Sequence, residues 1–379
     1  MFSKQFKRMS RMTALILSVF VVLTLIVNVV TPDQSFSASE NRSLAQFPKY
    51  NIYSLMNGDY TQKINNWFSD QFVGRSFLVK VKYVLQKMAM VKQIEDVYLG
   101  KDMLIEDTAV INQENYDKNL AAINAFADAY PEGVLKSFML VPNAVSVQSD
   151  RLPMAAYPAS QFETMDAFYN SLTVNLQRID VRSILSEHAS EYLYYKTDHH
   201  WTSLGAYYAF QIYAVNAGIE APGMDHYYRY TVHNDFKGTL ANRTGSTGLY
   251  DSIEIIVPKD CPDYIVTGFD KKTASIYSEE GLNSNDPYTV FFSGNTGLIS
   301  IETDVTSTRN LLVIKDSYAN AFIQYLIPYY QTITIIDPRY YTGNINDVMA
   351  SNGINEVLFL YNYNTYVQDT SLANVLSPQ

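Results

Sequence analysis

The sequence has one cysteine, two tryptophans and fewer basic than acidic side chains. The single cysteine, Cys261, excludes an internal disulfide framework and any zinc or iron–sulfur site built from several cysteines of one chain. The 28 lysines and arginines are outnumbered by 38 aspartates and glutamates, a formal charge of −10 that argues against a nucleic-acid binder. Tyrosine is abundant instead, with 31 residues among 379, and 47% hydrophobic residues suffice for a buried core.

The N-terminal segment has the features of a membrane anchor. Residues 1–12 carry four basic and no acidic side chains, and residues 13–30 carry no charge. A helix of that length reaches about 27 Å, enough to cross the hydrocarbon core of a bilayer. This charge bias predicts a cytoplasmic tail over 1–12, a retained transmembrane anchor over 13–30 and an acidic extracytoplasmic body. A cleaved signal peptide is the alternative for the apolar segment.

The rest of the chain predicts an α/β domain behind a linker. Residues 31–58 are polar and contain two prolines, whereas helical periodicity begins at Asp59 and is interrupted at Gly74. The C-terminal part alternates between strands and helices with short links, which is typical of parallel βαβ units. We expect strands over 311–314, 332–336 and 357–361, with helices over 318–327 and 345–351. The domain is expected to span 59–370, with an irregular β-rich insertion over about 225–305.

Two strand ends and one histidine segment carry side chains suited to catalysis, because function in open α/β sheets gathers where strands end. Ser317 follows an apolar strand and could be a nucleophile or a helix N-cap. Asp198 and His200 are two residues apart, so in an extended segment the carboxylate can orient the imidazole. Asn362 and Asn364 follow the last strand and could donate their amides to an oxyanion or form a turn.

We expect no metal and no cofactor. Asp198, His199 and His200 are possible ligands, but this spacing does not specify a metal site. No pair of histidines has the His-x-x-x-His spacing that places two ligands on one helix face.

Three strings along the chain resemble one family. TDHHW at 197–201, ENRSLAQFP at 40–48 and VYLGKDMLIED at 97–107 lie in the order found in the DHHW family of exported bacterial proteins. That family is similar to the alginate O-acetylation proteins, whose domain is a circularly permuted SGNH hydrolase-like fold. The resemblance implies a three-layer, permuted SGNH-like parallel sheet with helices on both faces, to which the insertion and the N-terminal helix are added.

The resemblance also implies roles for single residues. The Asp-x-His-Trp pattern of the acetylation proteins falls on Asp198, His200 and Trp201, and the nucleophile of the SGNH fold falls on Ser317. Ser317 would be the nucleophile, His200 the base and Asp198 the orienting acid, with Trp201 in a supporting position.

The sequence departs from the family pattern around the oxyanion hole. Lys315 stands where the nucleophile block has a glycine, and residues 338–341 contain no glycine. The last block would fall on Asn362 or Asn364, also without its glycine. The resemblance therefore supports the three reacting residues more fully than the groups that would stabilise an oxyanion.

Three functions are open at this point, and we favour an enzyme. The first is an extracytoplasmic O-acetyltransferase that acts on an exported or cell-wall polysaccharide through a Ser-His-Asp triad. The second is an acetyl esterase of the same fold, and the third is a non-catalytic polysaccharide-binding or scaffold protein. Acetyl-CoA is not expected outside the membrane, so the resemblance implies a membrane-bound O-acyltransferase partner that supplies acetyl groups. The protein is expected in the bacterial cell membrane, with a single pass.

Overall fold

The computed structural model describes residues 4–37, 42–130, 133–268, 271–351 and 353–376. The first three residues of the expected basic tail, and Glu40 and Asn41 of the family string, lie outside the described residues. The chain divides into an N-terminal unit, Met1–Ala89 with Asn242–Thr247, and a sheet unit, Met90–Ala241 with Gly248–Gln379. This division assigns residues 59–89, which we expected in the catalytic domain, to the N-terminal unit.

The N-terminal unit begins with one long apolar helix, α1 (Lys4–Val30). The most apolar window of its Phe6–Val30 stretch has a mean hydropathy of 2.7, and none of that window is buried. By length and composition α1 fits a membrane anchor or a signal sequence. The short strands β1 (Phe36–Ser37) and β2 (Arg42–Ser43) pair after it.

Three further helices complete the N-terminal unit: α2 (Ile52–Met56), α3 (Asp59–Gln71) and α4 (Arg75–Met88). Asn51 caps α2 by accepting a hydrogen bond from the backbone N–H of Tyr53. Gly74 separates α3 from α4 with a φ of 83°, a conformation that favours glycine. The break expected at this glycine is confirmed.

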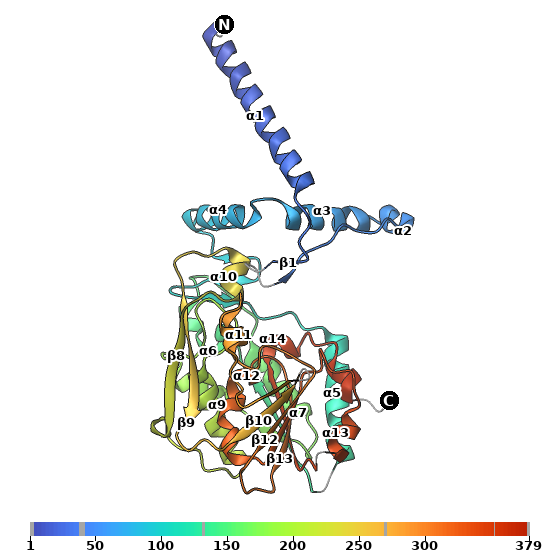
Figure 1. Ribbon diagram of the computed structural model, residues 1–379, viewed down its shortest axis with the longest axis vertical. Coiled ribbons are helices and arrows are strands. Elements are labelled where there is room, and N and C mark those ends of the chain that lie inside the picture. Colours follow the sequence, from blue (N-terminus) through green and yellow to red (C-terminus); the bar gives the residue numbers. More distant parts are fainter. Residues whose placement is uncertain (1–3, 38–41, 131–132, 269–270, 352, 377–379) are drawn as a thin grey trace. The chain divides into compact units, whose positions relative to one another are not determined.

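The sheet unit contains an eight-stranded sheet in the order β11-β10-β12-β14-β13-β15-β6-β7. Figure 1 labels three of its strands, β10, β12 and β13. Its strands are β6 (Leu135–Val141), β7 (Gln177–Ile179), β10 (Tyr264–Gly268), β11 (Lys271–Thr273), β12 (Leu298–Thr303), β13 (Asn310–Lys315), β14 (Thr332–Ile336) and β15 (Glu356–Asn362). The strands from β14 to β7 are parallel, and the other three pair antiparallel at one edge. The central strands are buried on both faces, which explains their continuous apolar runs.

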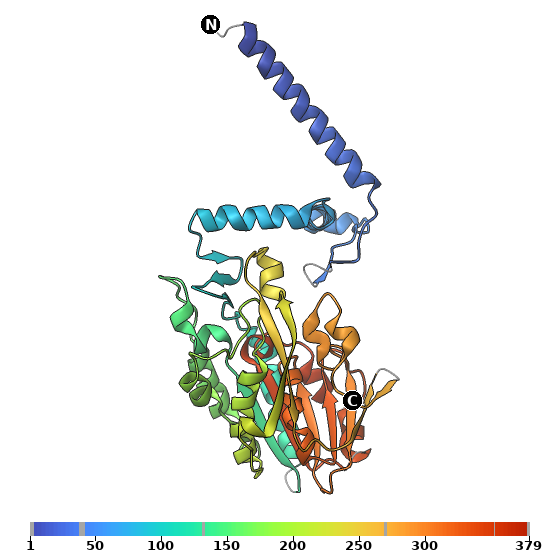
Figure 2. The same ribbon diagram turned by 60° about the vertical axis from the view of Figure 1, so that its left-hand side comes forward.

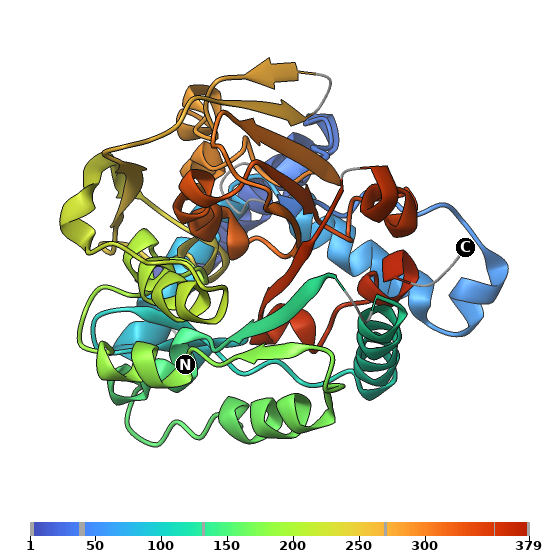
Figure 3. The same cartoon turned by 90° about the horizontal axis from the view of Figure 1, so that it is seen from below.

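Helices cover both faces of this sheet, as expected for the α/β class. Leu311 and Val313 of β13 belong to the hydrophobic core on one face, and Leu312 and Ile314 to the core on the other. The first core includes residues of α8 (Arg182–Glu187), α9 (Ser203–Asn216) and α12 (Ala319–Phe322). The second includes residues of α5 (Gln113–Ala129), α7 (Gln161–Ser171), α13 (Ile345–Ser351), α14 (Tyr363–Tyr366) and α15 (Leu372–Leu376). Figure 3 shows α9 on one side of the sheet and α5 with α13 on the other.

The expected insertion contributes to two different sheets. The strands β8 (Tyr227–Phe236) and β9 (Asp251–Pro258) form a separate antiparallel pair, drawn in yellow-green and yellow in Figure 2. By contrast, β10, β11 and β12 extend the main sheet at its antiparallel edge. A three-stranded sheet of β3 (Gln93–Ile94), β4 (Val97–Leu99) and β5 (Leu104–Glu106) contains the VYLGKDMLIED string.

The other helices are short: α6 (Ala144–Val147), α10 (Thr239–Thr244), α11 (Glu279–Leu282), η1 (Ser149–Arg151), η2 (Met224–His226), η3 (Pro287–Val290), η4 (Ile323–Tyr325) and η5 (Ile327–Tyr329), where η marks a 3-10 helix.

Candidate active site

Ser317 lies in the turn between β13 and α12, and a buried carboxylate fixes that turn. The Asp316 side chain accepts hydrogen bonds from the backbone N–H of Tyr318, at 2.8 Å, and from the backbone N–H of Asn362, also at 2.8 Å. Asp316 is completely buried, and burial raises its pKa to about 6. The ends of two adjacent strands are thereby joined, and Ser317 is presented at the edge of the sheet.

The segment that carries the histidines is held by a second carboxylate, Asp251 on β9. Asp251 accepts the backbone N–H of Lys196 and that of Thr197, both at 2.8 Å. On the other side, the backbone N–H of Gly238 donates to the Thr197 hydroxyl at 3.0 Å. Gly238 also lies against Asp198 so closely that a Cβ atom at position 238 would be 2.1 Å from the Asp198 Cβ. The backbone around Asp198 is therefore fixed from two directions.

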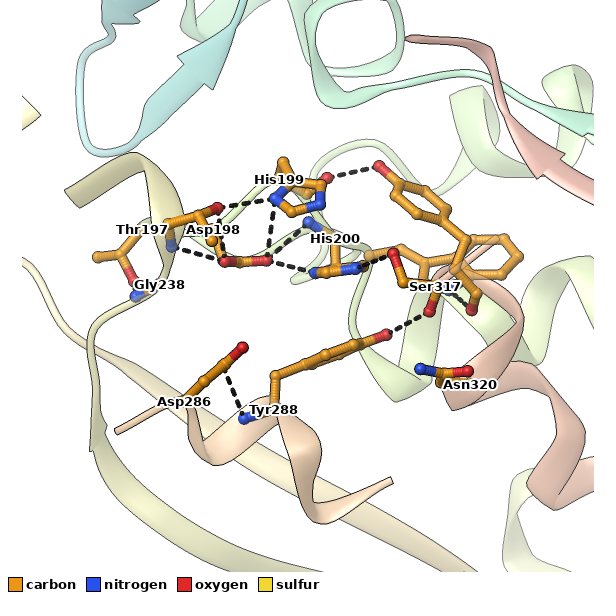
Figure 4. Close-up of polar contacts among 12 residues, drawn as sticks. Thr197, Asp198, His199, His200, Gly238, Asp286, Tyr288, Ser317 and Asn320 are labelled. Atoms are coloured by element: carbon orange, nitrogen blue, oxygen red, sulfur yellow. Dashed lines mark hydrogen bonds and ion pairs between the residues drawn. The ribbon is translucent and has the colours of Figure 1, made fainter. Parts of the chain in front are cut away.

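The structure brings Asp198, His200 and Ser317 together in that order (Figure 4). The Nδ1 atom of His200 is 2.6 Å from Asp198 Oδ1, and its Nε2 atom is 2.7 Å from Ser317 Oγ. The other carboxylate oxygen of Asp198 accepts the Thr239 backbone N–H at 2.7 Å and the Thr239 hydroxyl at 3.0 Å. His200 is 6% exposed and Ser317 is 8% exposed, so water has little access to this contact.

The protonation states suit a base beside a hydroxyl group. Burial alone would raise the pKa of Asp198, but the neighbouring His199 and His200 and the hydrogen bonds that it accepts hold that pKa well below its usual range. Burial lowers the pKa of His200 to about 4, although Asp198 opposes this shift. An ionised Asp198 only accepts hydrogen bonds, so the proton of a neutral His200 lies on Nδ1. Its Nε2 lone pair then faces the Ser317 hydroxyl.

Tyr288, which sequence reasoning did not single out, completes the surroundings of the imidazole. Its ring stacks on that of His200 with a centroid distance of 3.9 Å and an interplanar angle of 15°. The His199 ring lies at 4.0 Å from that of His200, and in Figure 4 it is on the side away from Tyr288. The Tyr288 hydroxyl donates to the backbone carbonyl of Ser317 at 3.1 Å. In the sequence, Tyr288 follows Asp286-Pro287, a helix start that is common and carries no functional information.

Trp201 supports the serine turn from the interior. The side chain is fully buried, and its indole N–H donates to the backbone carbonyl of Tyr318 at 2.8 Å. Trp201 thus contacts the residue that follows Ser317.

The side-chain amides of Asn362 and Asn364 already donate hydrogen bonds to other groups of the protein. Asn362 donates to Asp316 at 2.6 Å and to the Thr365 hydroxyl at 2.7 Å. Asn364 donates to Glu106 at 3.1 Å and to the backbone carbonyl of Asp107 at 2.8 Å. Either side chain would have to break one of these bonds to reach an oxyanion.

Lys315 stands where the family pattern has a glycine, and its buried ammonium group forms contacts that hold the fold together. Its Nζ atom donates to Asn320 at 2.8 Å and to Asn295 at 3.0 Å, and lies 3.4 Å from Asp337. Burial lowers the pKa of Lys315 to about 8. Asp337 also accepts two hydrogen bonds from the guanidinium group of Arg339, at 2.9 and 2.7 Å. Lys315 therefore connects the end of β13 to the carboxylate that follows β14.

A pocket of about 620 Å³ adjoins the histidines. It is lined by His199, Arg339, Asn362, Asn364 and Thr365, among others. A pocket of about 660 Å³ elsewhere in the sheet unit is lined by Ile276, Tyr277 and Phe292, and no triad residue lines it. Asp198, His200 and Ser317 do not line the 620 Å³ pocket either, but its lining residue His199 has its ring 4.0 Å from that of His200.

A metal ion could be held by three neighbouring residues whose ligand atoms lie within 4.8 Å of one another: Asp198, His199 and His200. These atoms already take part in hydrogen bonds within the protein. The His199 Nδ1 atom is 2.7 Å from the Thr239 hydroxyl, and both ring nitrogens of His200 contact triad partners. A metal would have to displace these contacts, and the expectation of no metal stays a prediction.

A family model described as DHHW protein matches residues 86–336, about two thirds of the chain. A solved DHHW family protein from Eubacterium siraeum is 26% identical with a TM-score of 0.63, over 74% of this chain and 96% of that chain. Bacillus cereus PatB1 is 21% identical, with TM-scores of 0.61 and, in its structure with a sulfonyl adduct, 0.62. The two PatB1 structures match 73% and 74% of this chain and 98% and 97% of their own.

The O-acetyltransferase domain of Pseudomonas putida AlgJ matches at 14% identity and a TM-score of 0.46, over 73% of this chain and 94% of that chain. No curated protein matches the chain. The family expected from the three sequence strings is confirmed by the family model. The mixed α/β fold, with its large and mostly parallel sheet, is confirmed as well.

Proposed function

The chain belongs to the DHHW family, and on that basis we propose that it transfers acetyl groups to hydroxyls of an exported or cell-wall polysaccharide. The observation that carries this proposal is the continuous contact from Asp198 through His200 to Ser317, at 2.6 and 2.7 Å. These are the groups and the order that nucleophilic acyl transfer requires.

In the first step, the Ser317 hydroxyl attacks the acetyl carbonyl carbon while His200 Nε2 takes its proton. The imidazolium ion, stabilised by Asp198, gives this proton to the departing oxygen or sulfur of the donor. In the second step, His200 takes the proton of a sugar hydroxyl whose oxygen attacks the acetyl-serine. The Ser317–acetyl bond breaks, and the serine oxygen recovers its proton from His200.

The developing oxyanion needs a hydrogen-bond donor near the serine. We assign this role first to the backbone N–H of Ser317, which has no hydrogen-bond partner among the described residues. Asn362 or Asn364 would contribute after a local rearrangement, since both amides have other acceptors. Tyr288 and Trp201 would position the reacting groups by holding two successive backbone carbonyls, those of Ser317 and Tyr318.

The proposal places the protein in the bacterial cell membrane. Residues 1–12 would be cytoplasmic, 13–30 the single membrane pass, and 31–58 a linker to an extracytoplasmic SGNH-like domain over 59–370, with its insertion at about 225–305. A membrane-bound O-acyltransferase would supply the acetyl group from the cytoplasmic side. No metal or cofactor takes part in the proposed chemistry.

A non-catalytic glycan-binding function is the main competitor. Two observations favour it: Lys315 in place of the glycine of the nucleophile block, and amides of Asn362 and Asn364 that are engaged elsewhere. An acetyl esterase is the second competitor, because water can replace the sugar in the second step.

The test compares wild type with Ser317→Ala, using an aryl acetate as donor and oligosaccharides as acceptors. We expect the variant to lose roughly 10³-fold or more in acetyl turnover. Ser186→Ala, an exposed serine on α8, is the matched control and should keep full turnover. A sulfonyl fluoride should label Ser317 in the wild type, which mass spectrometry of peptides can locate.

Each competing function has its own outcome in this test. Acetyl release to water at the same rate with and without an acceptor indicates an esterase. Glycan binding without turnover or labelling in the wild type indicates a binding protein. Turnover that survives in Ser317→Ala removes the triad assignment.

A further inference from the structure

Helix α4 carries its large apolar side chains on one face and exposes them. We call this set the α4 stripe: Phe77, Leu78, Val81, Val84, Leu85 and Met88. Their exposed fractions lie between 36% for Val81 and 75% for Met88. At 100° per residue these positions fall on a single side of the helix. A helix of a water-soluble protein would bury such a stripe in its core.

The opposite face of α4 is the one that packs within the N-terminal unit. Tyr83 is only 3% exposed. Gly245 approaches Val79 so closely that a Cβ atom at position 245 would lie 2.6 Å from Val79 Cγ1. A contact within the unit thus lies on the face of Val79, and the α4 stripe is on the other side of the helix.

The charges on α4 match an anionic surface. Within a chain of net charge −10, this helix has four basic residues, Arg75, Lys80, Lys82 and Lys87, and no acidic one. Lys80 and Lys82 fall on opposite borders of the α4 stripe at helical spacing. Long basic side chains at such borders can bury their stems in apolar surroundings and extend their ammonium groups to phosphates.

Hydrogen bonds tie the start of α4 and the helix before it to the end of the candidate membrane span. The backbone N–H of Val73, two residues before α4, donates to the side chain of Asn28 at 2.9 Å. Asn28 lies in the last turn of α1. The indole N–H of Trp67 in α3 donates to Asp33, just after α1, at 2.6 Å. If α1 crosses the bilayer, α4 begins at the level of the lipid headgroups.

We propose that α4 is an interfacial helix, with the α4 stripe inserted among acyl chains and its lysines against anionic phospholipid headgroups. The occupant is the lipid surface of the membrane that α1 enters, because apolar stripe, basic borders and attachment to α1 coincide on one helix. The proposal is independent of acetyl transfer. It gives the protein a second membrane attachment beside its span.

The test uses the full chain in a Cys261→Ser background, since Cys261 is its one cysteine and is exposed. A bimane label is placed on Leu85→Cys in the α4 stripe, or on Leu78→Cys as a second stripe position. Val174→Cys, an apolar residue of the sheet unit that is 95% exposed, is the matched control. Each protein is reconstituted in vesicles of phosphatidylcholine with a phosphatidylglycerol fraction, with or without brominated acyl chains.

We expect brominated lipids to quench labels at positions 85 and 78 about threefold more than the label at 174. Lys80→Glu combined with Lys87→Glu should reduce this quenching and remove its dependence on phosphatidylglycerol. The matched change of two exposed lysines on β11, Lys271→Glu with Lys272→Glu, should leave it unchanged.

Two results would overturn the proposal. In the first, soluble iodide quenches positions 85 and 78 as strongly as position 174, and brominated lipid quenches none of them. In the second, unlabelled cysteines at position 85 of two copies form a disulfide on oxidation, and in a separate sample the label at position 85 is shielded from both quenchers, so a second copy covers the stripe. Flotation of the vesicles shows in each case that the labelled protein is still membrane-bound through α1.

Discussion

The sheet unit and helix α4 of the N-terminal unit differ in how far their large side chains are exposed. In the sheet unit, tyrosines such as Tyr194, Tyr318 and Tyr330 are almost completely buried around polar groups. On α4 of the N-terminal unit, side chains as apolar as Phe77 and Leu85 are more than half exposed. The exposed apolar side chains of α4 form one continuous stripe, whereas these tyrosines lie in the core of the sheet unit. This difference is what the proposed interfacial position of α4 would require.

The same contrast holds for charged groups. In the sheet unit Asp198, Asp316 and Lys315 are buried, and each has specific partners. On α4 the lysines at positions 80, 82 and 87 are exposed. A buried charge is sensitive to the loss of one partner, whereas an exposed one is not. The following predictions use this difference.

The largest effect is expected from Asp198→Asn. The amide keeps the size of the carboxylate but donates a hydrogen to Nδ1 of His200, which favours the wrong tautomer. We expect acetyl turnover to fall by about 10³- to 10⁴-fold. Asp59→Asn, in the first turn of α3, is the control and should turn over like wild type. Activity within tenfold of wild type in Asp198→Asn would contradict the assigned role.

Lys315→Met is expected to cause the largest loss of stability. It removes a buried ammonium group from Asn320, Asn295 and Asp337, leaving their acceptors short of one donor. We expect the free energy of unfolding to fall by about 3 kcal/mol. Lys80→Met on α4 should change it by less than about 0.5 kcal/mol. Urea titration in detergent measures the free energy of unfolding of both variants. Equal losses would contradict the difference between buried and exposed charges in the two units.

The pH dependence of turnover reports on the burial of His200. Because burial lowers its pKa to about 4, the imidazole is neutral, and able to accept a proton, at all higher pH values. We expect kcat/KM to fall about tenfold per unit below about pH 4, and a smaller change near pH 6 to come from Asp316, whose pKa burial raises to about 6. A tenfold-per-unit fall of kcat/KM that begins near the ordinary pKa of histidine, about 6.5, would show that the His200 ring is solvated in the working protein.

A smaller effect is expected for Tyr288→Phe. The variant keeps the ring on His200 but loses the hydrogen bond to the Ser317 carbonyl. We expect about a fivefold loss of kcat/KM with an unchanged acid limb, which corresponds to one hydrogen bond of about 1 kcal/mol. Tyr288→Leu also removes the stacked ring and should shift the acid limb. If both variants share one pH profile, Tyr288 acts only through the fold.

Much of the fold could be predicted because its signals are local. The strands beyond residue 311, the helix over 345–351 and the break at Gly74 follow from periodicity and turn chemistry. The helix expected over 318–327 is instead the short α12, followed by the 3-10 helices η4 and η5. The antiparallel edge formed by β10 and β12 could not be predicted, since Tyr264 pairs with Thr303 far along the chain. The same limit applies to α4: its period predicts a helix, but an interfacial helix and a core helix share that period.

The candidate site was predictable in part for the same reason. The spacing of Asp198 and His200 is local, whereas their meeting with Ser317 rested on the family resemblance. Partners of Asn362 and Tyr288 come from other strands and loops, so no sequence pattern reports them. Whether the residues react as expected stays a prediction.

The closeness of Gly238 to Asp198 limits how the site can vary. Even the smallest side chain at position 238 would overlap the Asp198 Cβ, so the carboxylate would have to leave His200. In a library with all twenty amino acids at this position, selection for acetyl turnover should return glycine alone. The restriction to glycine at position 238, a loop residue about forty positions after Asp198, is therefore part of what holds the triad in place.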